Sequence, residues 1–123
     1  MTDRLPFEYA VLRVVPRVER GECINAGIVV YCRANAFLAS RVHLDEQRLH
    51  AIDAQAMSAD IARALAAAAD CDPRGGDSLG QRFRWLTAPR STVVQPGPIH
   101  TGLTNDPAAE LSRLFATLVL AAE

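Results

Sequence analysis

The chain has 123 residues, half of them apolar, and a formal net charge of −1. This length suits one domain that buries roughly two thirds of the surface of its unfolded chain. A charge so close to zero disfavours a protein dedicated to coating nucleic acid or an anionic membrane, so neither is expected as a partner.

Three strands are expected in the N-terminal part of the chain, at residues 7–15, 24–33 and 37–44. Aromatic and β-branched residues dominate the first segment, and the third alternates Leu38, Val42 and Leu44 with polar residues. The second segment is apolar on both faces, which predicts a central place in its sheet. The link of residues 33–36 is short enough for a hairpin, and a connection that short predicts antiparallel pairing.

Two helices are expected to follow these strands. Asp45 is placed to cap a short one, and Ser58 is placed to cap another that continues through Ala69. The Pro- and Gly-containing run at 72–77 is predicted to be a loop.

The C-terminal part is expected to add two or three strands and one helix. Residues 83–87, 92–95 and 99–103 are the predicted strands. Asp106 caps the helix and Pro107 takes its first turn, and the apolar stripe consists of Leu111, Leu114, Phe115, Leu118 and Val119. The whole order predicts a single α+β domain over residues 1–123, with an antiparallel sheet of about five strands and helices packed on one face.

The cysteines and the N-terminal segment indicate the compartment. Cys23, Cys32 and Cys71 form an odd set without CxxC spacing, which is typical of a reducing environment. The first residues show no signal-peptide pattern. No apolar run approaches the roughly 20 residues of a membrane span. We therefore expect a cytoplasmic protein without membrane association.

The segment 78–105 contains none of the chain's 14 acidic residues, yet it has three arginines and three prolines. Its guanidinium, hydroxyl and amide groups are those that an anion, a phosphate or an acidic partner would need. The candidate anion- or partner-binding residues in it are Arg90, Ser91, Thr92, His100 and Thr101. The candidate supporting residues are Glu22, Asn25, Arg82, Arg84 and Trp85.

Several of these residues have two interpretations. Asn25 could present its amide beside Glu22 while Gly27 lets a ligand approach, or Asn25 bonds to the backbone and Gly27 relieves crowding. Arg82 and Arg84 alternate with apolar residues, which predicts either a cation–π and base-stacking surface or a strand with its arginines in water.

Catalytic and metal-binding patterns are incomplete. His100 beside a hydroxyl could transfer a proton, although a lone histidine is more often structural. No complete three-ligand metal set, Walker loop or Rossmann glycine pattern occurs in the sequence. We therefore predict no metal and no cofactor, and whether the protein is an enzyme stays open.

Two blocks of sequence resemble a bacterial family, domain of unknown function 3037. They are YAVLRVVPRVERGECINAGIVVYC at residues 9–32 and RFRWLTAPRSTVVQPGPIHTGL at residues 82–103. The resemblance implies a small cytoplasmic protein and transfers no activity. It also implies a protein partner or a regulatory role, because genes of this family often lie beside a kinase of the persistence-toxin (HipA-like) type.

Three hypotheses follow. The first is a non-catalytic interaction or regulatory module that binds an acidic or phosphorylated partner, the HipA-like kinase being one candidate. The second is a phosphate-ester or nucleic-acid-processing enzyme, in which Arg90 holds the phosphate and His100 transfers a proton, while Glu22 or Asn25 orients the substrate. The third is salt-sensitive binding of single-stranded nucleic acid through Arg82, Arg84 and Trp85.

Overall fold

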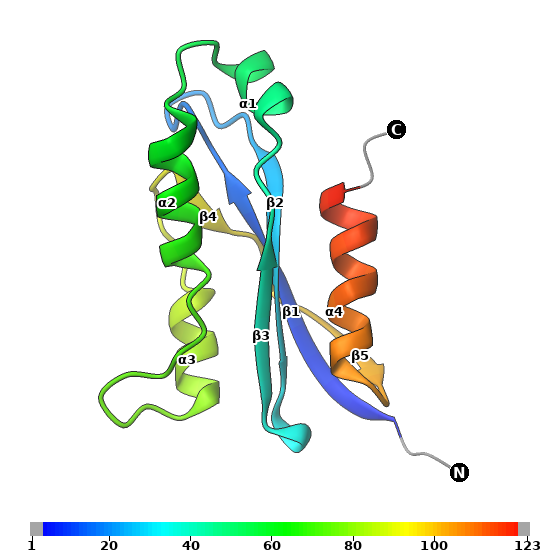
Figure 1. The fold of residues 1–123 in the computed structure, drawn as a ribbon. Helices are drawn as coiled ribbons and strands as arrows, with labels where there is room; N and C mark the ends of the chain where they lie inside the picture. Colours follow the sequence, from blue (N-terminus) through cyan, green and yellow to red (C-terminus); the bar gives the residue numbers. More distant parts are fainter. Residues whose placement is uncertain (1–3, 121–123) are drawn as a thin grey trace.

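The computed structural model describes residues 4–120, so the first and last three residues of the predicted domain lie outside it. The described strands are β1 (Leu5–Val14), β2 (Ile24–Cys32), β3 (Phe37–Val42), β4 (Val94–Pro96) and β5 (His100–Thr104). The helices are α1 (Glu46–Ile52), α2 (Ser58–Ala68), α3 (Leu79–Leu86) and α4 (Pro107–Phe115) (Figure 1). A short 3-10 turn, η1 (Arg33–Asn35), joins β2 to β3, and a π-helical turn, η2 (Ala116–Leu120), follows α4.

The strands form one antiparallel sheet in the order β3-β2-β1, with β4 and β5 both pairing with the remaining edge of β1. Leu12 to Val14 pair with β4, and Leu5 to Tyr9 pair with β5. Between the two short strands, the backbone N–H of Gly97 donates to Val11 O at 2.7 Å, which keeps the interrupted edge attached. The predicted α+β class and antiparallel five-stranded sheet are confirmed, and β2 is an inner strand as expected.

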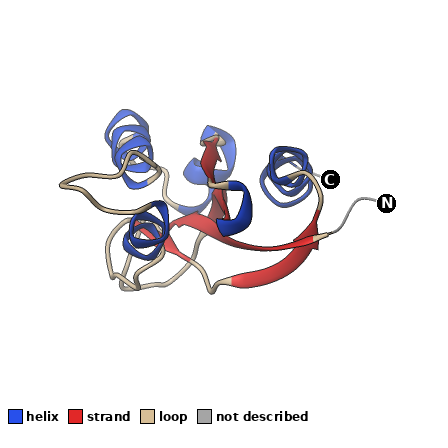
Figure 2. Ribbon diagram, turned by 90° about the horizontal axis from the view of Figure 1, so that it is seen from below, coloured by secondary structure: helices blue, strands red, loops and turns tan. Residues whose placement is uncertain are grey.

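Helices cover both faces of this sheet. One buried cluster joins it to α1, α2 and α3, and contains Leu12, Val29, Leu49, Leu65 and Phe83 among others. The second joins it to α4, and contains Phe7, Ile28, Val30, Leu111 and Phe115 among others. Figures 1 and 2 show α4, next to the C-terminus, separated by the strands from α2 and α3. The structure thus differs from the expected packing on one face: β2 is apolar on both faces, and each face needs its own cover.

The helix starts follow from local capping. The Asp45 carboxylate accepts from Arg48 N at 3.1 Å, and Asp106 accepts from Ala109 N at 3.1 Å, as the sequence predicted. Ser58 is different, because it is the first residue inside α2 and Met57 precedes the helix without a side-chain cap. The predicted capping role of Ser58 is therefore wrong.

The predicted strand at 83–87 is also wrong, since these residues lie in α3 and at its end. A capping box starts this helix: Ser78 Oγ accepts from Gln81 N, and Gln81 Oε1 accepts from Ser78 N. Phe83 and Leu86 then share one side of α3 and enter the core. The helix matters for function because it changes where Arg82 and Arg84 point.

The close packing of β3 against β2 explains why residue 27 is a glycine. A Cβ atom there would lie 2.8 Å from Val42 Cγ1 and 3.2 Å from Arg41 O. The close approach of β3 to β2 therefore accounts for the glycine, which favours the structural interpretation over a ligand contact.

Candidate anion-binding site

Arg82 is a structural residue in the middle of α3. The residue is only 5% exposed. Its Nε and Nη2 donate to the backbone oxygen of Asp70 at 2.8 and 2.5 Å, and Nη2 lies 4.0 Å from the Asp70 carboxylate. The guanidinium therefore fastens the end of α2 to α3 and has little capacity left for a ligand.

The Asp70 carboxyl group is held in its charged form. It accepts from Asp72 N at 3.0 Å and from Arg74 Nη2 at 2.5 Å. These two hydrogen bonds, the backbone one first, lower the pKa of Asp70 below its ordinary value. Asp70 supplies both a carbonyl and a carboxylate to the cationic segment, so part of that segment's charge is balanced from outside it.

Arg90 is also engaged within the molecule. Its Nη2 donates to Trp85 O at 2.5 Å and its Nε to Ala88 O at 3.2 Å, which satisfies carbonyl groups at the C-terminal end of α3. The guanidinium carbons of Arg82 and Arg90 lie 4.1 and 4.9 Å from the Trp85 ring centre. Trp85 is 48% exposed, but these two cations occupy its surroundings.

The remaining predicted residues do not share one cleft. Asn25 Nδ2 donates to Leu118 O at 3.1 Å and so holds η2. Glu22 pairs with Arg20 at 2.8 Å in the loop beyond the Val14 end of β1. His100 stacks on Tyr9 at 5.2 Å, on the α4 face, whereas Arg90 contacts α3 on the opposite face.

The hydroxyl groups of the segment also lie apart from one another. Ser91 is exposed, and Thr92 Oγ1 donates to Val94 O at 2.8 Å within its own loop. Thr101 pairs with Glu8 across the β1–β5 ladder. The enzyme hypothesis needed Arg90, His100 and Glu22 or Asn25 around one point, and this geometry gives it no support.

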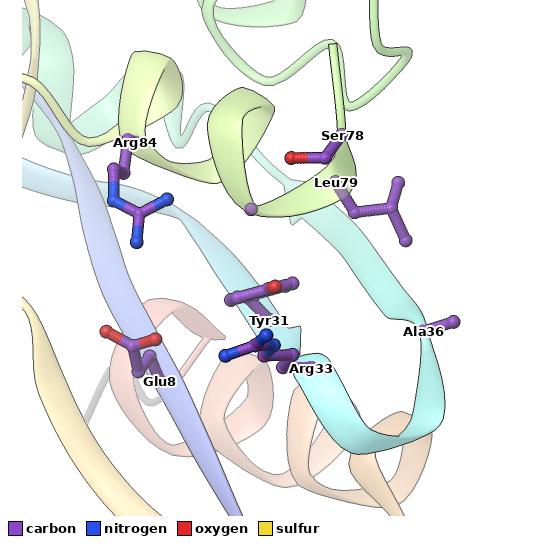
Figure 3. A pocket seen from close by; sticks show the side chains of 8 residues that line it. Glu8, Tyr31, Arg33, Ala36, Ser78, Leu79 and Arg84 are labelled. Carbon is purple, nitrogen blue, oxygen red and sulfur yellow. The ribbon is translucent and has the colours of Figure 1, made fainter.

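Arg84, in contrast, faces a pocket of about 570 Å³ at the N-terminal end of α3. Figure 3 shows its guanidinium directed toward the same space as the side chains of Glu8 and Arg33. The full lining is Glu8, Tyr31, Arg33, Ala36, Ser78, Leu79, Gly80 and Arg84. We call this space the Arg33–Arg84 pocket.

The fold brings these side chains together from three separate segments. Glu8 and Tyr31 are partners in the β1–β2 ladder, and Arg33 follows directly where β2 ends and η1 begins. The Tyr31 ring stacks on Phe83 of α3 at 5.2 Å, which fixes the helix above the sheet. A Cβ atom at Gly80 would lie 2.9 Å from the Tyr31 hydroxyl oxygen, so the glycine allows this contact.

The charges of the pocket are not matched by partners. Seven of the 13 arginines form ion pairs within residues 4–120. Among these described residues, neither Arg33 nor Arg84 has an ion-pair or hydrogen-bond partner for its guanidinium, and Glu8 has none for its carboxylate. Two cations and one anion around one space leave a local formal charge of +1, to which the N-terminus of α3 adds positive potential.

A second hollow of about 590 Å³ adjoins the first and shares Glu8, Tyr31 and Arg33 with it. Its other lining residues are Pro6, Phe7, Ala34 and Thr101, so it is mainly apolar. We call it the apolar hollow. Of the predicted binding residues, Thr101 borders the apolar hollow. Of the predicted supporting residues, Arg84 borders the Arg33–Arg84 pocket.

Sequence reasoning missed Glu8, Tyr31 and Arg33. Their only local signal is the predicted hairpin between the second and third strands, which places Arg33 at a strand end. Within residues 4–120, no group of three or more His, Cys, Asp or Glu side chains could hold a metal ion. No helix in the same range is long and apolar enough to cross a membrane.

The chain belongs to the DUF3037 family, described as proteins of unknown function, whose model matches residues 9–119. Neither the curated proteins nor the solved structures provide a match to this chain. We therefore infer the function from the geometry of the pocket.

Proposed function

We propose that the chain is a non-catalytic, cytoplasmic interaction module of a bacterial family, which holds an acidic or phosphorylated segment of a protein partner in the Arg33–Arg84 pocket. The observation that carries this proposal is the pair of exposed guanidiniums that face one space without partners in residues 4–120. Guanidinium groups bind carboxylate and phosphate through charge-assisted hydrogen bonds.

Recognition fits this pocket better than catalysis. Ser78, the only lining residue with an aliphatic hydroxyl, uses its oxygen to cap α3. The lining contains no histidine or cysteine that could act with it as a base or nucleophile. What the side chains offer is two cations, one carboxylate and a tyrosine, a set suited to holding a charged segment in place.

Two capped peptides test the proposal by NMR titration of the ¹⁵N-labelled chain: Leu-Ser-Glu and its phosphoserine counterpart, Leu-Ser-phosphoserine. We expect at least one of them to shift the Nε–H signals of Arg33 and Arg84. The double variant Arg33→Ala/Arg84→Ala should weaken that binding about tenfold or more. If neither peptide shifts these signals, the proposal is wrong.

The matched control is Arg17→Ala/Arg63→Ala, which removes the same charge from two exposed arginines that pair with Glu19 and Asp60. Equal loss of binding in both double variants would mean that net charge, and not the pocket, attracts the peptide. With the HipA-like kinase as purified partner, the same two variants should differ in co-purification, and equal retention would contradict its docking here.

A further inference from the structure

Strand β3 forms one margin of the sheet, and its outer edge is open. Among the strands of residues 4–120, only β2 pairs with it, along the whole length from Phe37 to Val42. Figures 1 and 2 show β3 with α2 and α3 on one side and α4 on the other, at the end of the sheet away from β5. The edge is thus open to another strand in the plane of the sheet.

The hydrogen-bonding groups of β3 alternate between its two sides. His43 N donates to Ala26 O at 2.8 Å, so residue 43 bonds toward β2. Because neighbouring residues of an antiparallel strand alternate, the odd-numbered residues of β3 bond to β2 and the even-numbered ones direct their N–H and C=O outward. Within residues 4–120, these outward groups have no hydrogen-bond partner; they belong to Leu38, Ser40 and Val42.

This edge has little protection against further pairing. Edge strands are usually blunted by Pro, by Lys, by an inward-pointing charge or by a bulge. The β3 sequence FLASRV contains no Pro or Lys, and its pairing with β2 has no register shift. Its one charged residue, Arg41, places its guanidinium carbon 5.5 Å from the ring centre of Phe115, over α4. The backbone edge itself is therefore accessible to another strand.

We infer that this edge is the interface of a homodimer, in which β3 pairs antiparallel with β3 of a second copy in a register centred on Ser40. Each outward residue then lies opposite an outward residue of the second copy, so that all the free N–H and C=O groups are paired. Such a contact is two-fold symmetric and uses the same surface of both copies. The inference concerns a different surface from the Arg33–Arg84 pocket and is independent of the proposed function.

Two observations select this register over its neighbours. A register centred on Ala39 would set Val42 opposite the second copy's Ala36, whose N–H already donates to Arg33 O within its own chain at 3.1 Å. A register centred on Arg41 would set two guanidiniums directly opposite each other, which is destabilising. The register centred on Ser40 avoids both costs.

The side chains also suit a second copy of this chain. In the register centred on Ser40, Leu38 lies opposite the second copy's Val42, and both side chains already pack at the margin of the core beneath α2 and α3. On the α4 face, Arg41 lies opposite the second copy's Ala39, so no like charges meet. The formal net charge of −1 adds little repulsion between two copies.

Sedimentation of the unmodified chain over a dilution series from about 1 mM to about 1 μM tests the inference. We expect a dimer at the upper end that dissociates on dilution. In a mixture of ¹³C-labelled and unlabelled protein, isotope-filtered NMR should show an interchain contact between the Hα atoms of Ala39 and Arg41, which form a close, non-hydrogen-bonded pair in this register.

Ser40→Pro is the variant that breaks the interface. It removes one outward N–H from each copy at the symmetry axis and leaves the bonds to β2 in place, so dimerisation should weaken about tenfold or more. Ser40→Ala is the matched control, because it removes the hydrogen bond from Ser40 Oγ to Ala69 O but keeps the N–H. It should dimerise like the unmodified chain.

A monomer throughout the dilution series would overturn the inference and leave this edge to a strand of another protein. A dimer without the interchain Hα contact, or one that a folded Ser40→Pro variant forms as tightly as the unmodified chain, would also overturn it. If Ser40→Pro does not fold, the Hα contact in the unmodified chain decides. Peptide binding in the Arg33–Arg84 pocket is measured separately, so the failure of one proposal is distinguishable from the failure of the other.

Discussion

Arg82 and Arg84 lie two residues apart on α3 and have opposite roles. Arg82 is 5% exposed and bonds to the Asp70 carbonyl, whereas Arg84 is exposed and faces the Arg33–Arg84 pocket. Each residue of an α-helix turns about 100°, so side chains two positions apart point in nearly opposite directions. The charge of a segment alone therefore does not define a binding surface: in this cationic segment, Arg82 stabilises the fold and Arg84 remains available for a ligand.

The largest effect that tests this comparison is on stability. Arg82→Ala leaves the Asp70 carbonyl without its donors and removes packing against Trp85, so it should cost about 3 kcal/mol of the free energy of unfolding. Arg84→Ala loses no partner in residues 4–120 and should change that free energy by less than about 0.5 kcal/mol. Urea unfolding followed by circular dichroism measures both. Equal destabilisation would erase the distinction between the two residues.

A second prediction concerns the contact that positions α3 over the pocket. Gly80→Ala places a Cβ atom against the Tyr31 hydroxyl, and the overlap outweighs the gain in helix propensity, for a net loss of about 1 kcal/mol. Binding of the better peptide should weaken as well, because Tyr31 lines both hollows. Removing the hydroxyl by Tyr31→Phe in the same chain should relieve part of the loss. A stabilising Gly80→Ala would show that this close approach is unimportant.

A third prediction uses Cys71, which lies next to the Asp70 carbonyl that Arg82 binds. Burial raises the pKa of the Cys71 thiol, so little of it is thiolate at neutral pH and alkylation should be slow. Arg82→Ala loosens this region and should speed alkylation of Cys71 several-fold, while Arg84→Ala should not. Mass spectrometry of iodoacetamide-treated protein distinguishes Cys71 from the exposed Cys23. Identical Cys71 rates in the two variants would contradict the fastening role of Arg82.

The smallest expected effect is on the pH dependence of the free energy of unfolding. The pKa of Asp70 in the folded protein lies below its ordinary value of 3.8, so the folded state binds this proton less tightly than the unfolded state. Its contribution to stability is therefore complete above about pH 5 and is lost as the pH falls through the folded-state pKa. Asp70→Asn should show a smaller loss of stability between about pH 6 and pH 3 than the unmodified chain. An unchanged pH profile would mean that this carboxylate does not contribute.

Much of the fold could be predicted, because its signals are local. The apolar character of β2 on both faces indicated an inner strand, and Asp106 with Pro107 marked the start of α4. The same two-sided character of β2 also contained the reason for helices on both faces. The prediction of a strand at 83–87 was wrong because a short alternation of arginine and aromatic residues fits the repeat of a strand as well as that of a helix. The capping box at Ser78 and Gln81 indicated a helix.

The site could be predicted only in part, because it is assembled from distant segments. Arg84 and Thr101 belong to the cationic segment that the sequence singled out; Arg84 borders the Arg33–Arg84 pocket and Thr101 borders the apolar hollow. Glu8 and Arg33 come from the first hairpin, and only the β1–β2 register together with the position of α3 brings them to the same space. No motif or residue spacing in the sequence indicates that Glu8, Arg33 and Arg84 lie around one pocket.

The most direct test of whether Arg33 and Arg84 are available for a ligand is to measure, by NMR of the free protein, how fast each arginine Nε–H proton exchanges with water. We expect a slowly exchanging proton for Arg82, whose Nε donates to the Asp70 carbonyl, and fast exchange for Arg33 and Arg84 until an acidic peptide is added. Protection of Arg33 and Arg84 equal to that of Arg82 in the absence of peptide would show that their guanidiniums are already engaged, and would contradict the proposed anion-binding role of the Arg33–Arg84 pocket.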